Sequence, residues 1–542
     1  MFDRNNLKGD IFGGITAAVV ALPLALAFGV SSGAGALAGL YGAIFAGACA
    51  AVCGGTRVQI TGPTGPMTVV MALVIIHFEG HLPAAFAVVI LAGLMQILFG
   101  KLGIGRYIKL VPQSVVSGFM SGIGIIIIIL QLPPLFGVSD VNGSTLVILS
   151  AFPHMLAALD VNTLVLGLAV LAVMFFTPAV VNRYLPTPLL ALLGGSLVAA
   201  LLSLDIAQIG AVPTGIPVFN IPDISLDELP YIMRFALVLA FLGSIDSLLT
   251  SIVADNMTRS THDSNRELVG QGIGNIASGL FAGLPGAGAT MRTLVNLRAG
   301  GTTRLSGVIH SVLLMMIVLG FGSAVSHIPL AVLAGILLKV GIDIIDWNYL
   351  RRLFSAPRAG VIIMMSTLLL TVLVDLITAF AVGFIMASVL FVARMADAQA
   401  ANARFTFGDD QLDDLSPTES EILNQANGRI VLFHVEGPLS FGCARDIARL
   451  LQSKIEKDVL AIDLRHVPFI DSSAAAALDE VIQRLSEDGD RVLLFGAREP
   501  VRKLLLQTGV LERLGAENLL GSRMEALEVA RAIIDDYRPA AD

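Results

Sequence analysis

One carboxylate in the sequence stands where a charge is costly. Asp246 lies in Phe241-Leu-Gly-Ser-Ile-Asp-Ser-Leu-Leu-Thr250, with apolar sequence on both sides. A carboxylate at the centre of a membrane costs about 2.5–3.5 kcal/mol, so such a residue predicts a function. Thr250 follows four residues later and shares its helix face. An anionic oxygen and a hydroxyl on one face suit a hard cation. The alternative is a purely structural carboxylate that Ser or Thr hydroxyls satisfy.

Two interrupted apolar stretches predict a complementary anion site. The first break is Gln59-Ile-Thr-Gly-Pro-Thr-Gly-Pro-Met-Thr68, and the second break is Leu284-Pro-Gly-Ala-Gly-Ala-Thr-Met-Arg-Thr293. Pro, Gly and Thr suit the interior of a straight helix poorly. A short helix follows each break, and the one at 290–299 covers roughly half of the hydrocarbon thickness. A helix that begins in mid-membrane leaves its first N–H groups unpaired, and their positive end attracts an anion. Paired breaks of this kind are typical of a transporter's binding site.

The charges at these breaks bear on which anion would bind. The two helix ends contribute roughly +0.5 each. A monovalent cation at Asp246 would offset the carboxylate and leave about +1, which suits a monoanion. Arg292 lies in the first turn of the second short helix. If Arg292 points into the cavity, a divalent anion fits better, and if it points to the cytoplasmic vestibule, the monoanion stands.

The elements that must position these residues are membrane helices. The chain has 542 residues, of which 55% are hydrophobic and 14% charged, with a mean hydropathy of +0.82. Most of the chain therefore lies in lipid. A net charge of −8 without basic tracts argues against nucleic acid. No motif of an enzyme occurs, so we expect neither an enzyme nor a cofactor.

The fourteen expected spans are 11–29, 35–53, 64–78, 84–100, 112–131, 162–178, 188–204, 232–254, 268–282, 290–299, 304–323, 329–345, 359–376 and 378–394.

The order of these spans predicts an inverted repeat. The first break lies in the third span and the second break in the tenth, an odd offset of seven. The two copies then run in opposite directions and aim two half-helix N-termini at one another near the midplane. Loops 132–161 and 205–231 contain no Lys or Arg. The positive-inside rule therefore places both termini in the cytoplasm, with the chain multi-pass in the inner (plasma) membrane.

The composition changes at about residue 395. We expect a transport domain at 1–395, a linker at 396–428 and a small α/β domain at 429–542. Strands and helices of similar length alternate in that tail, which favours an open sheet covered by helices. The expected strands are 430–436, 459–464 and 491–495, and the expected helices are 443–455, 472–486, 499–508 and 522–535.

Together these features resemble the sulfate permease family of anion transporters, also called the SulP or solute carrier 26 family. Asp10-Ile-Phe-Gly-Gly-Ile-Thr-Ala-Ala-Val-Val-Ala-Leu-Pro23 is similar to that family's first span, and the tail is similar to its STAS domain. Within the family, the two breaks and Gly243-Ser-Ile-Asp-Ser247 look most like cyanobacterial sodium-dependent bicarbonate transporters. The resemblance covers essentially the whole chain.

That resemblance implies a fold, a function and an assembly. The fold is a UraA-like 7+7 inverted repeat with two half-helices, in which a core domain moves against a gate domain. The function is sodium-coupled import of bicarbonate by alternating access, and the assembly is a homodimer joined mainly through the STAS domains. The implied sodium ligands are Asp246, Thr250, Gly288, Ala289 and Thr290. The residues assigned to the anion are Thr64 and Gly65, with Ala289, Thr290 and Arg292 at the second helix end.

A separate motif in the tail suggests regulation. Phe469-Ile-Asp-Ser-Ser-Ala474 resembles the strand-to-helix turn of anti-sigma-factor antagonists, where a serine can be phosphorylated. Ala474 replaces the usual Gly. Ser472 or Ser473 is then a regulatory site or, as we favour, a plain helix N-cap.

Three classes of function remain open from the sequence. A sodium-coupled anion importer uses both the helix ends and Asp246. An uncoupled or proton-coupled transporter or exchanger of sulfate, chloride or dicarboxylate needs the helix ends but does not need a sodium site at Asp246. A membrane-anchored signalling protein would use the STAS domain alone. The position of Asp246 favours the first class.

Overall fold

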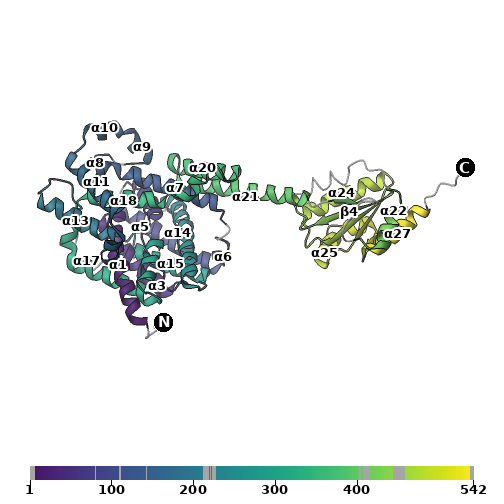
Figure 1. The fold of residues 1–542 in the computed structure, drawn as a ribbon, viewed down its shortest axis with the longest axis horizontal. Coiled ribbons are helices and arrows are strands. Elements are labelled where there is room, and N and C mark those ends of the chain that lie inside the picture. Colours follow the sequence, from purple (N-terminus) through teal and green to yellow (C-terminus); the bar gives the residue numbers. More distant parts are fainter. Residues whose placement is uncertain are drawn as a thin grey trace. The chain divides into compact units, whose positions relative to one another are not determined.

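The structure is a computed structural model that divides into two compact units, Met1–Ala387 and Ser388–Asp542 (Figure 1). It describes residues 6–79, 81–108, 111–138, 140–141, 143–210, 219, 221–222, 227–401, 404–406, 415–442 and 458–536. The boundary between the two units falls inside one long helix, α21. Each unit is described by itself.

The first unit is helical throughout, apart from two very short strands. Its helices, the last of which continues into the second unit, are α1 (Leu7–Ser31), α2 (Ala36–Tyr41), the π-helix η2 (Gly42–Ala46), α3 (Gly47–Cys53), α4 (Gly65–His77), α5 (Leu82–Lys101), α6 (Gly105–Ile108), α7 (Gln113–Leu130), α8 (Leu132–Phe136), α9 (Thr145–Ser150), α10 (Phe152–Ala157), α11 (Val161–Phe176), α12 (Ala179–Tyr184), α13 (Thr187–Leu201), α14 (Leu229–Thr258), α15 (Ser264–Leu280), α16 (Thr290–Arg298), α17 (Arg304–Val325), α18 (Leu330–Ile344), α19 (Trp347–Arg351), α20 (Arg358–Leu373) and α21 (Leu376–Ala401).

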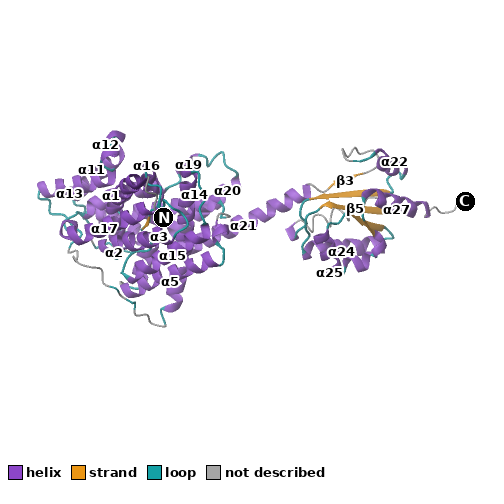
Figure 2. Cartoon of the chain, turned by 90° about the horizontal axis from the view of Figure 1, so that it is seen from below, coloured by secondary structure: helices purple, strands orange, loops and turns teal. Residues whose placement is uncertain are grey.

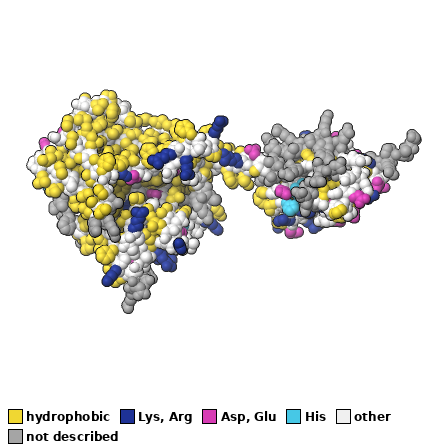
Figure 3. Space-filling view, viewed as in Figure 1, with side chains coloured by type: hydrophobic (Ala, Val, Ile, Leu, Met, Phe, Trp, Pro, Cys, Tyr) yellow, Lys and Arg dark blue, Asp and Glu magenta, His cyan; other side chains and the backbone are white. Residues whose placement is uncertain are grey.

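Each of the fourteen segments expected from the sequence coincides with a helix, or with α2, η2 and α3 in series. Among the described residues, six helices are long and apolar enough to cross a membrane, and several shorter apolar helices accompany them. Hydrophobic side chains cover much of the face of this unit in Figure 3, as a surface in lipid requires. The chain is therefore a multi-pass membrane protein, while the number of crossings stays a prediction.

The helices of the first unit pack in two groups. In one group, α5 lies against α14 and α15, α1 against α16 and α17, and α3 against α15 and α17. In the other, α7 lies against α18 and α20, and α11 lies against α13 and α18. The half-helices that follow the two breaks, α4 and α16, both pack against α1 and α14, so the breaks belong to the first group. These groups correspond to the core and gate that the resemblance implies.

The second unit is a five-stranded sheet covered by helices on both faces (Figure 2). The strands lie in the order β3-β4-β5-β6-β7, with β3 antiparallel to β4 and all later pairs parallel. Its strands are β3 (Arg404–Thr406), β4 (Ile430–Glu436), β5 (Val459–His466), β6 (Arg491–Phe495) and β7 (Leu519–Leu520). Its helices are α22 (Pro417–Gln425), α24 (Ser472–Glu487), α25 (Glu499–Gln507), α26 (Val510–Leu514), the 3₁₀ helix η3 (Ala516–Asn518) and α27 (Arg523–Asp536).

Alternate residues of the central strands fill the two faces of this sheet. Val431 and Phe433 of β4 join the core beneath α24, α25 and α26. Ile430, one residue earlier, packs with α22 and α27 on the opposite face. Because a parallel sheet covered on both faces buries every strand residue, these strands read as continuous apolar runs. That explains why the three central strands and three of the four helices were predictable.

Two parts of the second unit differ from the expectation. The expected linker, 396–428, contains β3 and α22, and α22 packs with α27 beside the sheet. A short antiparallel edge strand carries too few residues to show an alternating pattern. The expected helix 443–455 lies outside the described residues. The domain boundaries therefore stay a prediction.

Candidate functional site

The two breaks meet at the centre of the first group of helices. Their extended residues form a two-stranded antiparallel pair, β1 (Thr61–Gly62) and β2 (Ala287–Gly288). Thr61 lies opposite Gly288, and the amide of Ala289 donates to the carbonyl of Ile60 at 2.9 Å. Segments more than two hundred residues apart are thus fixed side by side. The pairing satisfies backbone groups that an unwound segment would otherwise leave unbonded in lipid.

A half-helix leaves this strand pair on each side. Thr64 precedes α4 and Ala289 precedes α16, both in extended conformation and neither with a side chain capping its helix. Uncapped first-turn N–H groups carry roughly half a positive charge at each end. The structure therefore brings together the two helix ends that the sequence assigned to an anion.

The face of α14 that carries Asp246 lies against the second break. The Thr250 hydroxyl donates to the carbonyl of Gly288 at 2.9 Å and lies 2.7 Å from the Thr290 hydroxyl. One turn earlier, the Ser247 hydroxyl accepts from the amide of Gly288 at 3.0 Å. Hydroxyl and carbonyl oxygens thus converge one helical turn from Asp246. They are the oxygen donors that a hard cation prefers.

Three polar atoms at this junction have no hydrogen-bond partner in the described part of the chain. They are the Thr64 hydroxyl, Oδ2 of Asp246 and Nη1 of Arg292, and all three are buried. The Thr64 side chain lies close enough to the Asp246 carboxylate for a weak hydrogen bond, and the Arg292 guanidinium attracts that carboxylate. Buried polar groups are normally hydrogen-bonded, and leaving one unsatisfied costs about 1–3 kcal/mol. Together they indicate a place for polar ligands.

Arg292 points into the protein. Its side chain is 2% exposed, and Nη2 donates to the carbonyl of Pro63 in the first break. A Cβ atom at Gly62 would lie 2.5 Å from Nη1, so glycine at this position leaves room for the guanidinium as it is placed. The sequence left open whether Arg292 points inward or toward the cytoplasmic vestibule, and the structure shows that it points inward. The guanidinium ties the second half-helix to the first break.

Gly65 marks where the first half-helix meets the other group of helices. A side chain at this position would lie 2.8 Å from Ile127 of α7 and 2.6 Å from Ile344 of α18. Glycine avoids this overlap, and a larger residue would require the two isoleucine side chains to move. The ligand roles assigned to Gly65, Ala289 and the other site residues stay predictions.

A polar stripe on α15 supports both breaks, and the sequence analysis missed it. Glu267 accepts hydrogen bonds from the amides of Gly55 and Thr56, at 2.8 and 2.7 Å, just before the first break. Asn275 accepts from the amide of Gly286 at 2.7 Å and donates to its carbonyl at 3.0 Å. The signal was present, because Glu267, Gln271, Asn275 and Ser278 recur at helical spacing in an otherwise apolar span.

The tail motif has a different cap from the one expected. The N-cap of α24 is Asp471, whose Oδ1 accepts from the amide of Ala474 at 2.8 Å. Ser472 and Ser473 are the first two residues of the helix, and both are exposed. The N-cap role favoured for these serines is therefore wrong, because the carboxylate before them occupies the position. A regulatory role for either serine stays a prediction.

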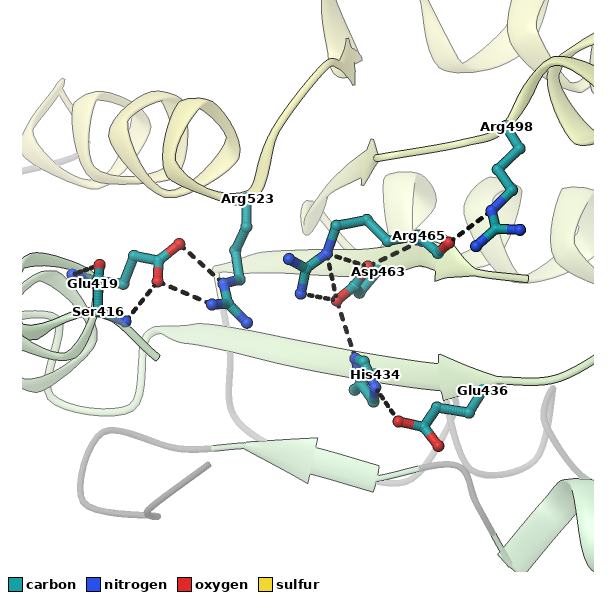
Figure 4. A network of polar contacts seen from close by, with 8 residues as sticks. All are labelled: Ser416, Glu419, His434, Glu436, Asp463, Arg465, Arg498 and Arg523. Carbon is teal, nitrogen blue, oxygen red and sulfur yellow. Dashed lines mark hydrogen bonds and ion pairs between the residues drawn. The ribbon is translucent and has the colours of Figure 1, made fainter. Parts of the chain in front are cut away.

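A second buried polar cluster lies in the sheet of the second unit (Figure 4). Asp463 of β5 is 0% exposed and lies opposite His434 of β4, whose Nδ1 is 2.9 Å from Oδ2. Arg465 donates to the same carboxylate through Nη2 at 2.8 Å. The other His434 nitrogen is 3.0 Å from Glu436. The hydrogen bond with Asp463 raises the pKa of His434. Burial alone would raise the pKa of Asp463, but hydrogen bonds from His434 and Arg465 lower it.

Comparison with known proteins identifies both units. The sulfate permease family model matches residues 7–367, and the STAS domain model matches residues 421–522. The bicarbonate transporter BicA of Picosynechococcus is 43% identical over 99% of this chain and 96% of its own length. The putative sulfate transporter YvdB of Bacillus subtilis is 33% identical over 86% of this chain and 87% of its own length.

Solved structures agree with the family match. The transmembrane domain of a cyanobacterial BicA superposes with a TM-score of 0.66 and 47% identity, covering 70% of this chain and 98% of that one. The murine solute carrier 26 family member A9 anion transporter, in its inward-facing state, gives a TM-score of 0.85 at 18% identity over 98% of this chain and 92% of that one, and shows the fold. Family and relatives are transporters and not enzymes, which confirms that prediction. The chain therefore belongs to the sulfate permease family of membrane transporters and carries a STAS domain.

Proposed function

We propose that this protein imports bicarbonate together with sodium. The observation that carries the proposal is the unpartnered Oδ2 of Asp246, one turn from the oxygen cluster of Thr250, Gly288 and Thr290. Sodium takes the carboxylate and these neutral oxygens as ligands, with Ala289 contributing at the same helix end. Bicarbonate then binds between the N-termini of α4 and α16, near Thr64 and Gly65. The BicA relatives, named as bicarbonate transporters, support this choice of anion.

Sodium and bicarbonate support one another in this arrangement. Without a cation, the Asp246 carboxylate repels an anion held at the adjacent helix end. Sodium neutralises that repulsion, so bicarbonate binding improves, and by linkage bicarbonate raises the affinity for sodium by the same factor. Arg292 holds the two breaks together through Pro63 and adds positive charge beside Asp246.

Transport follows by alternating access. The first group of helices carries the whole site and moves as a core, while α7 and α18 belong to the gate. The close approach of Gly65 to Ile127 and Ile344 is where the two slide past one another. The chain lies in the inner membrane with both termini in the cytoplasm, because the loops without Lys or Arg face outward. Two copies assemble through their STAS domains.

The decisive experiment is uptake of labelled bicarbonate into proteoliposomes. We expect uptake with an inward sodium gradient and little uptake when potassium replaces sodium on both sides. Equal uptake in the two conditions would exclude coupling to sodium. No uptake in either condition, from protein shown to be folded, would exclude bicarbonate transport.

The inward position of Arg292 favours a second candidate, a divalent anion such as sulfate. Two helix ends, Arg292, Asp246 and one sodium sum to about +2, which suits a dianion better than a monoanion. The relatives named as putative sulfate transporters are consistent with this alternative. Competition separates the two candidates. Unlabelled sulfate that inhibits bicarbonate uptake as strongly as unlabelled bicarbonate would favour the divalent anion.

A further inference from the structure

Three arginines from different elements converge at one end of the first unit. Arg57 follows α3, Arg266 lies in the first turn of α15, and Arg304 begins α17. Arg57 and Arg266 both lie within electrostatic range of Arg304, so like charges are held together. These three residues are called the arginine cluster here. Figure 3 shows several Lys and Arg side chains on the part of the first unit that lies toward the start of α1.

Two of the three arginines, Arg266 and Arg304, cap the C-terminus of α3. Arg304 donates to the carbonyls of Val52 and Gly54, at 3.2 and 2.6 Å, and Arg266 donates to the carbonyl of Cys53 at 3.3 Å. These carbonyls form the C-terminus of α3, which carries roughly half a negative charge. Capping therefore explains the positions of two arginines but offsets only a small part of three positive charges.

The nearby carboxylates do not balance the remainder. Glu267 lies within electrostatic range of Arg304, but its oxygens accept from the amides of Gly55 and Thr56 and from the side chains of Gln59 and Gln271. Asp263, the N-cap of α15, accepts from the amide of Arg266 and adds a second carboxylate. Three arginines, two carboxylates and one helix C-terminus leave about +0.5. Among the described residues, Arg57 is exposed and makes no hydrogen bond or ion pair. Nε of Arg304 is buried without a partner in the same part of the chain.

A membrane crossing by the segment next to the arginine cluster would place the cluster at the depth of lipid headgroups. The arginine cluster surrounds the end of Ala36–Cys53, a candidate membrane span of 18 residues. At 1.5 Å per residue this span is about 27 Å long, close to the hydrocarbon thickness. Val52 exposes 41% of its surface beside the cluster, and Val312 and Met316 of the adjacent α17 expose 52% and 55%. Apolar surface for acyl chains therefore lies next to a cationic site.

We propose that the arginine cluster binds the phosphate headgroup of an anionic phospholipid. The positive-inside rule favours basic residues at this end but does not require three of them to gather around the end of one helix. A phosphodiester brings the charge and the acceptor oxygens that Arg57 and Arg304 lack, and arginine binds phosphate through paired hydrogen bonds. The bound lipid links α3, α15 and α17, three helices of the core. This proposal is independent of the transported ion.

The test measures lipid binding by the full chain without bicarbonate. The protein is placed in nanodiscs of phosphatidylcholine with increasing fractions of phosphatidylglycerol, and the thermal midpoint is recorded. The wild type should gain stability with phosphatidylglycerol, because a ligand that binds only the folded state stabilises it. Arg57→Gln should need about fivefold more phosphatidylglycerol for the same gain. Arg57→Lys, which keeps the charge, should recover most of the response.

Arg298→Gln is the matched control. Arg298 is exposed at the end of α16, so this variant removes the same charge outside the arginine cluster. It should respond to phosphatidylglycerol as the wild type does. An equal loss in Arg298→Gln and Arg57→Gln, or a wild type that ignores phosphatidylglycerol, would overturn the proposal. Inorganic phosphate that stabilises the protein equally well in pure phosphatidylcholine would overturn the assignment to lipid and identify free phosphate as the ligand.

Discussion

Two carboxylates of the molecule, Asp463 and Asp246, have surroundings that are opposite in character. Asp463 in the sheet has hydrogen bonds to both oxygens, from His434 and Arg465. Asp246 in the membrane keeps one buried oxygen without a partner, beside a hydroxyl and a guanidinium nitrogen that also lack one. Both positions are costly for a charge. The protein offsets this cost with hydrogen bonds to both oxygens at Asp463, but at Asp246 it leaves one oxygen without a partner.

The contrast separates a structural ion network from a ligand site. When a buried charge is fully hydrogen-bonded, removing it destabilises the fold, because its partners are left unpaired. When a buried charge is left partly unpaired, the fold gains little from it, and an external ligand is the expected partner. Substitutions that remove one charge at each position should therefore have opposite effects on stability and on transport.

The largest effect on stability is expected for Asp463→Asn. The variant leaves His434 and Arg465 without the charge that they surround, and we expect a loss of about 3 kcal/mol from the STAS domain. Unfolding by denaturant, followed by hydrogen exchange at β4 and β5, would measure it. Sodium dependence of uptake should not change, because the proposed ion site lies wholly in the first unit.

Glu480→Gln is the control, because it removes a charge that contributes little to the stability of the STAS domain. Glu480 and Arg484 form an ion pair on α24 with more than half of each side chain exposed. Such pairs contribute at most about 0.5 kcal/mol. If Asp463→Asn costs no more than Glu480→Gln, the network around Asp463 does not hold the sheet together.

The largest effect on transport is expected for Asp246→Asn. The side chain keeps its size and loses its charge, so sodium dependence should vanish. Coupling free energies between two sites are typically about 1–3 kcal/mol, so uptake at saturating sodium should fall by a factor of about 5 to 150. The initial uptake rate, measured against sodium concentration, gives both the sodium dependence and the size of this fall. The thermal midpoint should stay constant or rise, since an incompletely paired charge has been removed.

Asp10→Asn is the matched control in the same unit. Asp10 is 1% exposed, and its oxygens accept from the amides of Thr302 and Thr303 and from the Thr303 hydroxyl. Its substitution should reduce stability and leave sodium dependence intact. An Asp246→Asn variant that keeps wild-type sodium dependence would remove this carboxylate from the mechanism.

Most of the fold followed from patterns that the sequence displays directly. Apolar runs located the helices, and continuous apolar strands located the centre of the sheet. The short strand β3 and the two-residue strands β1 and β2 are too short to leave a period. Their existence depends on segments distant in the chain, such as Thr61 opposite Gly288.

The site was predictable in its composition and not in its geometry. Asp246 and the two breaks were identified because a charge, Pro and Gly are expensive in a membrane span. The direction of Arg292 depended on the carbonyl of Pro63, which lies 229 residues earlier. The polar spacing on α15 is visible in the sequence, but the partners of Glu267 are not, because two of them are the backbone amides of Gly55 and Thr56, more than two hundred residues earlier. The sequence therefore reveals which residues are costly to place in a membrane span more readily than it reveals their hydrogen-bond partners.

A smaller effect on transport is expected for Thr250→Ala. The change removes one neutral oxygen from the proposed sodium site and leaves Asp246 in place. Loss of one such contact is worth about 1 kcal/mol, so half-maximal uptake should need about fivefold more sodium. Thr367→Ala is the control, because Thr367 is equally buried and bonds only the carbonyl of Ile363 in its own helix. Equal shifts in the two variants would mean that Thr250 is structural.

The smallest expected effect is the pH dependence of the STAS domain. The pKa of His434 is raised on folding, so its contribution is fully present below the unfolded value of about 6.5 and is lost as the pH rises through the folded value. The pKa of Asp463 is lowered, so its contribution is present above about 4 and is lost as the pH falls through the folded value. Stability from this pair is therefore greatest between about pH 4 and 6.5.

Hydrogen exchange at β4 and β5, corrected for the intrinsic rate at each pH, should show protection falling as the pH is raised from 6 to 9. His434→Gln should flatten that fall, because the neutral amide cannot lose a proton. A wild type whose protection stays constant over this range would show that His434 is not held protonated by Asp463, and the network would then owe its stability to Arg465 alone.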